Sequence, residues 1–141
     1  MQQDKVAILI KKAALEFEKM SNPYFAEYEL TVAQYKVLKY LYGEISGTAR
    51  VTDFEKCYSM THPTTLGLLE NLEKKGFIER IDNPNDKRGK LVSLTDKALN
   101  MRDSLLSLGD VIENRFTESL TKREKEELVA LLLKLLCKSA D

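Results

Sequence analysis

Two short segments of the chain alternate apolar and polar residues, which is the period of a β-strand. They read "FIERI" at 77–81 and "KLVSL" at 90–94, and the turn-forming stretch "NPNDKRGK" at 83–90 joins them. Strands this close in sequence pair as an antiparallel hairpin. The other apolar residues recur at steps of three and four, the spacing of amphipathic helices. The sequence therefore predicts a mainly α-helical fold that carries one small β-hairpin, with residues 83–90 at its tip.

Helix-capping patterns mark where most of the predicted helices begin. A threonine followed three residues later by Glu or Gln has the spacing of a capping box, and a proline disfavours helix at the residue before it. We expect capping boxes at Thr31–Gln34, Thr52–Glu55 and Thr121–Glu124, further N-caps at Thr61 and Thr95, and helix ends at Pro23 and Gly76. The predicted helices span residues 5–20, 30–44, 51–58, 62–76, 94–116 and 121–138, with the hairpin between the fourth and the fifth.

The charge of the chain is balanced, with 22 Lys and Arg against 22 Asp and Glu. A globally basic chain, the simplest sign of nucleic-acid binding, is therefore excluded. The predicted hairpin tip nevertheless holds three cations, Lys87, Arg88 and Lys90, around Gly89. Two short predicted helices with a tight connection at 59–60 precede the hairpin, so the order is that of a winged helix-turn-helix. In this arrangement the second helix enters the major groove of duplex DNA, and a cationic hairpin reaches phosphates or the minor groove.

Residues 30–95 resemble the MarR family of bacterial transcriptional regulators. The resemblance rests on "LTVAQYKVL" from residue 30 and on "LEKKGFIERIDNPNDKRGKLVSLT" at 72–95, which contains the D-x-R pattern of the wing. It implies a winged helix-turn-helix DNA-binding region over 30–95, with dimerisation helices at 1–22 and 96–141. It also implies a homodimer that binds a pseudo-palindromic operator on double-stranded DNA. Such proteins usually repress, and a small phenolic or other lipophilic ligand often releases them.

The resemblance also implies roles for residues of the wing. Arg88 is expected in the minor groove, and Asp86 is expected to hold the wing by pairing with a basic neighbour, for which Arg80 is a candidate. The sequence departs from the family in the recognition helix, where many relatives have a polar residue followed by Arg and this chain has Leu66 and Gly67. The predicted DNA-binding residues are Thr61, His62, Thr64, Thr65, Lys87, Arg88 and Lys90, with Asn71 as a further reader of bases.

Both terminal regions hold more apolar residues than contact with a single core needs. In residues 121–138 apolar side chains cover more than one face of the predicted helix, and the first helix has the same excess. A second copy of the chain would bury this surface, so we expect a homodimer. Around the junction of the first two helices, Phe17, Tyr24 and Tyr35 either line a pocket for an apolar ligand or belong to the core.

Other functional classes find no support in the sequence. Cys57 and Cys137 predict neither a disulfide nor a zinc site, and we expect small buried residues there, with redox sensing left open. His62 is the only histidine, so no metal site, cofactor or catalytic constellation is expected. Neither a signal peptide nor a bilayer-spanning segment is recognised, which indicates a cytoplasmic protein. The alternative to DNA binding is a winged-helix adaptor that binds another protein.

Overall fold

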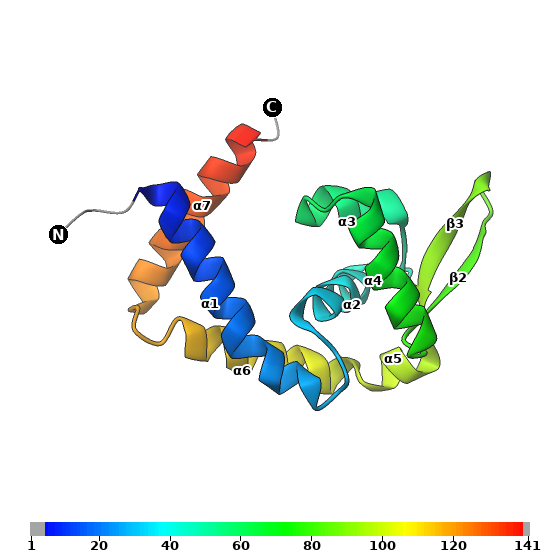
Figure 1. Cartoon of the computed structure of the whole chain (residues 1–141), viewed down its shortest axis with the longest axis horizontal. Coiled ribbons are helices and arrows are strands. Elements are labelled where there is room, and N and C mark those ends of the chain that lie inside the picture. The colour runs from blue at the N-terminus through cyan, green and yellow to red at the C-terminus, as the bar shows by residue number, and fades with distance from the viewer. Residues whose placement is uncertain (1–4, 140–141) are drawn as a thin grey trace. The chain divides into compact units, whose positions relative to one another are not determined.

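The computed structural model describes residues 5–139, so residues 1–4 and 140–141 of the predicted dimerisation segments lie outside the described residues. The mainly helical winged fold predicted from the sequence is confirmed (Figure 1). The chain divides into two compact units after Leu108. The elements are α1 (Val6–Ala26), α2 (Val32–Gly43), β1 (Thr48–Arg50), α3 (Val51–Tyr58), α4 (His62–Lys74), β2 (Ile78–Asn83), β3 (Asp86–Leu94), α5 (Asp96–Asn100), α6 (Arg102–Phe116) and α7 (Lys122–Ser139).

The core of the first unit lies where α2, α3 and α4 meet the small sheet. One apolar face of each helix supplies fully buried side chains, and burying a Leu, Phe or Val side chain contributes about 1.5–3 kcal/mol. This core fixes the orientation of α4 relative to α3 and to the hairpin. Its members include Leu38 and Leu41 of α2, Phe54 of α3, Leu69 and Leu72 of α4, and Val92 of β3.

The sheet has three strands in the order β1–β3–β2, all antiparallel. The sequence predicted β2 and β3, but it did not predict β1, because "TAR" is too short to show an alternating pattern. Thr48 pairs with Ser93 and Arg50 with Leu91, so β1 binds the edge of β3 opposite to β2. Strand β1 thus anchors the base of the β2–β3 hairpin to the helical core.

Capping explains where α2 begins and where α4 ends. The predicted box at Thr31 and Gln34 is confirmed, since each side chain accepts a hydrogen bond from the backbone amide of the other residue. At the end of α4, Gly76 has a φ of 82°. The Gly76 amide donates to the Glu73 carbonyl at 3.0 Å, and the Phe77 amide donates to the Leu72 carbonyl, also at 3.0 Å. These two bonds form a Schellman motif, which requires a left-handed residue at the position of Gly76.

The capping box predicted at Thr52 and Glu55 is wrong. Helix α3 begins at Val51, directly after β1, and its N-cap is Arg50, so Thr52 already lies inside the first turn. The carboxylate that closes this helix end belongs to Asp53, which accepts from the backbone amide of Arg50 at 2.9 Å and from its guanidinium at 3.2 Å. Partial burial opposes ionisation of Asp53, but these bonds and the charge of Arg50 hold its pKa below the ordinary value.

The predicted end of the first helix at Pro23 is also wrong, because α1 continues to Ala26. A proline three residues before a helix end removes one backbone donor and leaves most of the helix intact. The last turn is held instead by tertiary contacts. Phe25 is 1% exposed and its ring stacks on that of Tyr35, with 4.3 Å between the centroids. The Asn22 side chain accepts from the Val32 amide at 3.0 Å, which joins α1 to the start of α2.

The single long helix predicted over 94–116 is divided at Met101 into α5 and α6. Thr95 caps α5 as predicted, accepting from the Ala98 amide. The break coincides with a tertiary hydrogen bond. The buried hydroxyl of Tyr42 donates to the Ala98 carbonyl at 2.6 Å, and a continuous α-helix would use this carbonyl for the amide of Arg102. The sequence could not reveal this bond, since its two residues are far apart along the chain.

The second unit contains the end of α6 and all of α7. Thr121 and Glu124 form the predicted capping box, with backbone-to-side-chain distances of 2.9 and 3.1 Å. Helix α7 is amphipathic, but its apolar residues stay open to solvent in the single chain. Exposed apolar side chains include Leu128, Val129, Leu131, Leu133 and Leu136 of α7, and Val6, Ile8, Leu9, Ile10 and Leu15 of α1 in the first unit. None of the helices within residues 5–139 is both long and apolar enough to cross a bilayer.

Candidate DNA-binding site

Helices α3 and α4 are joined by a sharp turn that sets the geometry of the site. Ser59 ends α3 in the left-handed conformation, with φ 52° and ψ 42°. The next amide, that of Met60, donates to the Glu55 carbonyl at 3.1 Å. The Tyr58 hydroxyl donates to the Lys36 carbonyl at 2.8 Å and fixes the end of α3 on α2. Burial of Tyr58 raises its pKa to about 12, so this donor stays protonated across the physiological range. The pair α3–α4 is therefore a firmly held helix-turn-helix.

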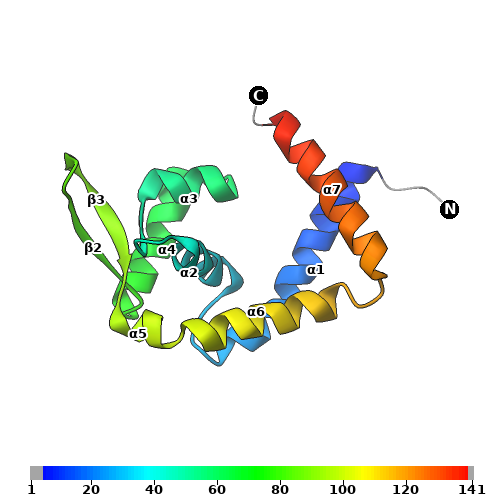
Figure 2. The ribbon, with the colours of Figure 1, turned by 180° about the vertical axis from the view of Figure 1, so that it is seen from behind.

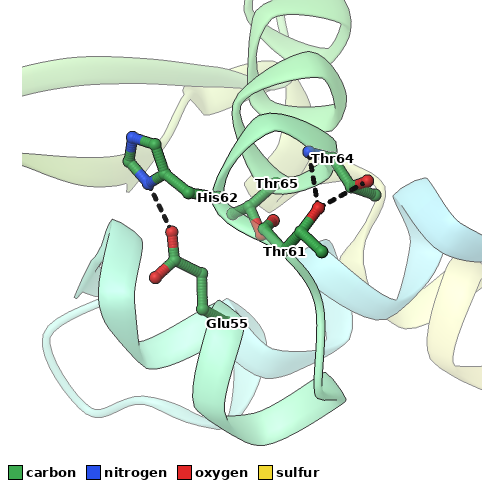
Figure 3. Close-up of polar contacts among 5 residues, drawn as sticks. All are labelled: Glu55, Thr61, His62, Thr64 and Thr65. Carbon is green, nitrogen blue, oxygen red and sulfur yellow. Dashed lines mark hydrogen bonds and ion pairs between the residues drawn. The ribbon is translucent and has the colours of Figure 1, made fainter.

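The N-terminus of α4 presents exposed polar side chains (Figure 3). Thr61 caps the helix, since its hydroxyl accepts from the Thr64 amide at 3.3 Å and donates to the Thr64 hydroxyl at 3.0 Å. Pro63 lies in the first turn, as predicted, where a missing N–H is harmless. Thr61, His62 and Thr64 are exposed. The unpaired amides of a helix N-terminus favour anionic groups such as phosphate.

The prediction that Thr65 reads DNA is contradicted by its position. Thr65 is 0% exposed, and its hydroxyl donates to the Thr61 carbonyl at 2.9 Å. It lies on the same face of α4 as Leu69 and Leu72, both of which belong to the core. A hydroxyl satisfied by the preceding turn of its own helix can be buried at low cost. Thr65 therefore stabilises α4 and does not reach the surface.

His62 contacts α3 through its imidazole. The Nδ1 atom lies 2.5 Å from Oε1 of Glu55, and the other ring nitrogen points away from the carboxylate (Figure 3). This contact places a proton on Nδ1 and leaves Nε2 for an outside group. Nε2 accepts a hydrogen bond in the neutral ring and donates one in the charged ring. Glu55 therefore orients the His62 side chain at the N-terminus of α4.

The wing is shaped differently from the prediction. Figure 1 and Figure 2 show β2 and β3 as a hairpin that extends beyond α3 and α4. The turn itself is only Pro84 and Asn85, and the cations lie on β3. Asp82 is opposite Lys90, whereas Asn83 is opposite Asp86. Lys87, Arg88 and Gly89 are therefore inserted into β3 without partners on β2, as in an extended β-bulge, and such insertions re-aim side chains.

The carboxylates of the wing have other partners than predicted. Asp86 accepts from the backbone amide of Arg88 at 2.9 Å, and within the described chain no ion pair joins it to Arg80. Arg80 lies on β2 opposite Val92, and its Nε is buried without a hydrogen-bond partner among residues 5–139. Asp86 thus supports the wing by fixing the backbone of Arg88. The ion pair of the hairpin joins Lys90 to Asp82 at 2.6 Å, and this hydrogen bond lowers the pKa of Asp82.

The unneutralised positive charge of the site therefore belongs to Lys87 and Arg88. Both are exposed, and neither forms an ion pair with a carboxylate in the described part of the chain. The charge of Lys90 is balanced by Asp82. Helix α4 carries no Lys or Arg before Lys74, so the cations come from the wing and short polar side chains come from the helix.

The residues predicted to bind a ligand divide between core and surface. Tyr35 is buried against Phe25, whereas Phe17 and Tyr24 are half-buried. An open pocket of about 520 Å³ lies elsewhere in the first unit, between the end of α2, β3 and the start of α6, and none of the three aromatic residues lines it. A ligand role for Phe17, Tyr24 and Tyr35 stays a prediction.

Two further expectations concern cysteines and metals. Cys57 and Cys137 were expected to be buried, and this is wrong, because both thiols are exposed. Cys57 is exposed on α3, one turn after the buried Phe54. Among the described residues, no group of three or more His, Cys, Asp or Glu side chains is placed to hold a metal ion.

Comparison with known proteins agrees with this geometry. A sequence model of the MarR family matches residues 30–90. The multiple antibiotic resistance protein MarR of Escherichia coli K12 is 34% identical over 122 residues, covering 84% of this chain and 82% of that protein. The structure of a mutant E. coli MarR with operator DNA superposes with a TM-score of 0.83, at 30% identity and 93% coverage of both chains. The S. aureus MepR–DNA complex gives 0.85, at 26% identity over 96% of this chain and 99% of that one. The chain belongs to the MarR family of transcriptional regulators.

Proposed function

We propose that the chain acts as a homodimeric repressor that binds a pseudo-palindromic operator on double-stranded DNA. The observation that carries the proposal is the helix-turn-helix in one compact unit with a hairpin on which the exposed cations Lys87 and Arg88 form no ion pair with a described residue. The N-terminus of α4 enters the major groove, where Thr61, His62 and Thr64 face the bases and phosphates. The solved complexes of MarR and MepR, the relatives of similar fold, contain DNA.

Arg88 reads the minor groove in this proposal. The insertion at Lys87–Gly89 turns these side chains away from the regular pleat of β3. Narrow minor grooves concentrate negative potential and attract guanidinium groups. Because Asp86 holds the Arg88 amide, the backbone at this point is ordered before DNA arrives. Lys90 acts mainly within the hairpin, through its pair with Asp82.

Dimerisation uses the apolar surface of α1 and α7. Val6 and Leu136 are each 64% exposed and Leu131 is 61% exposed in the single chain, and exposed apolar patches on this scale mark interfaces. A two-fold dimer places two α4 helices about 34 Å apart, on successive major grooves of one face of the duplex. Leu131→Glu should give a monomer in sedimentation velocity and abolish operator binding, and a stable dimer of this variant would contradict the interface.

Release by a small lipophilic ligand belongs to the same proposal. A ligand shifts the dimer away from DNA only if it binds the released conformation more tightly than the bound one. The half-buried Phe17 and Tyr24, both in the C-terminal half of α1, are the candidates for contact with an aromatic molecule. The proposed function is binding in the cytoplasm and not catalysis. Among residues 5–139 the hydrogen-bond partner of His62, the one histidine of the sequence, is the carboxylate of Glu55 and not a nucleophile.

Selection of random duplex DNA by the purified protein tests the function. The expected winners contain two related half-sites about one helical turn apart, and their affinity should fall steeply as salt rises. No binding to any duplex at low salt would overturn the proposal. In that case the surface around α4 and the wing would fit the alternative, an adaptor that binds another protein.

A further inference from the structure

Gly67 lies in the middle of α4, where the fold itself does not need a glycine. A Cβ added to Gly67 would meet no atom of the described chain within 4 Å, apart from its own helix turns. Its backbone is that of an ordinary helix, unlike Gly47 and Gly76, whose φ values are 67° and 82°. Glycine inside a helix is less stable than alanine. The reason for this residue must therefore lie outside the chain.

Gly67 is on the outward face of α4. Its neighbours one turn away are Pro63, Thr64, Glu70 and Asn71, and all four are exposed. The buried face of the helix carries Thr65, Leu69 and Leu72. The proposed function brings the outward face of α4 to the major groove, so the missing side chain is at the point of closest approach.

Three of the four side chains one turn from Gly67 are short, and only that of Glu70 is longer and acidic. Thr64 and Asn71 carry the short polar groups next to Gly67, and the long cationic Lys74 comes only at the end of the helix. The amide of the Asn71 side chain makes no hydrogen bond within the described residues, so both its donor and its acceptor are open to an outside partner. A short side chain reaches a base edge only if the helix backbone comes close to the groove floor.

We infer that Gly67 is a close-approach position that lets Thr64 and Asn71 read A·T base pairs. Asn pairs in bidentate fashion with the N6 and N7 atoms of adenine, and the methyl group of Thr packs against the methyl group of thymine. The inference rests on the proposed function, and it names the readout that replaces the missing arginine. Residue 67 then determines specificity because it has no side chain, which allows the backbone of α4 to approach the bases.

The test compares Gly67→Ala with Gly43→Ala. Gly43 is the last residue of α2, is exposed, and likewise has nothing within 4 Å of an added Cβ. Gly67→Ala should raise the melting temperature, because alanine favours helix, and should also raise the Kd for the selected operator by about tenfold or more, because a methyl group is forced into a packed interface. Gly43→Ala should leave the Kd unchanged.

Gly67→Ser and Asn71→Ala complete the series. The serine variant should weaken binding further than the alanine variant. Asn71→Ala should lose preference at an adenine position of each half-site when selection is repeated. Wild-type affinity in both Gly67 variants, or an equal loss in Gly43→Ala, would overturn the close-approach role, and unchanged preference in Asn71→Ala would overturn the A·T readout. Failure of the wild-type protein to bind any duplex would instead overturn the proposed function.

Discussion

Arg88→Ala tests the wing most directly, through the salt dependence of DNA binding. Each phosphate charge that a protein neutralises contributes about 0.9 to the slope of log K against log salt. A dimer loses Arg88 twice, so the slope should become shallower by about 1.8. Between roughly 50 and 200 mM salt, the loss of affinity should then be smaller than that of the wild type by a factor of about twelve.

Fluorescence anisotropy with a labelled operator, at five or more salt concentrations, measures this slope. Two controls separate a local contact from net charge. Lys19→Ala removes one cation from an exposed position on α1, and its slope should match the wild type. The double variant Asp82→Asn with Lys90→Ala removes the ion pair without changing the net charge, and its slope should also be unchanged. An Arg88→Ala slope equal to the wild type would refute the minor-groove assignment.

Three further predictions concern stability. Gly76→Ala places a Cβ on a residue with φ 82°, so it should lower the free energy of unfolding by about 1–2 kcal/mol in urea titrations, and no loss would show that the Schellman turn relaxes. Tyr42→Phe removes the buried bond to the Ala98 carbonyl and should cost about 1 kcal/mol in the same assay; an unchanged midpoint would mean that water replaces the hydroxyl. The folded-state pKa of Asp53 is lowered, so its stabilisation should be complete above the unfolded pKa of about 3.9 and disappear as pH falls through the folded value. Asp53→Asn should flatten the acid limb of the stability curve, and an identical limb would contradict this.

Local signals in the sequence were enough to locate most elements of the fold. The capping boxes at Thr31 and Thr121 and the left-handed stop at Gly76 depend on residues within five positions of one another, and all three are confirmed. Errors arose where a distant residue decides the outcome. The break at Met101 coincides with the bond from the Tyr42 hydroxyl to the Ala98 carbonyl, and the last turn of α1, beyond Pro23, is packed against Tyr35.

The candidate site shows the same division between local and tertiary information. The sequence placed cations in the hairpin, but the pairing of Lys90 with Asp82 depends on the strand register, which the insertion at Lys87–Gly89 shifts. Thr65 seemed a surface residue from its neighbours Thr61 and Thr64, although the helical period also puts it on the face of Leu69. That period was the available signal, and it would have removed Thr65 from the predicted readers.

The charge of the wing bears on how a neutral chain discriminates among DNA sequences. From Asp82 to Lys90 the hairpin has three cations and two carboxylates, a net charge of +1. Non-specific affinity comes almost entirely from phosphate neutralisation. A net charge of only +1 on the hairpin therefore gives weak binding to arbitrary DNA. Affinity for the operator must then come from shape complementarity between protein and DNA. Two features of the chain provide it, one in the wing and one in α4. Asp86 fixes the backbone of Arg88, and Gly67 clears the outward face of α4. A substitution that adds charge, such as Asp82→Asn alone, should raise affinity for all duplexes while reducing the ratio between operator and random DNA, and a preserved ratio would contradict this division of roles.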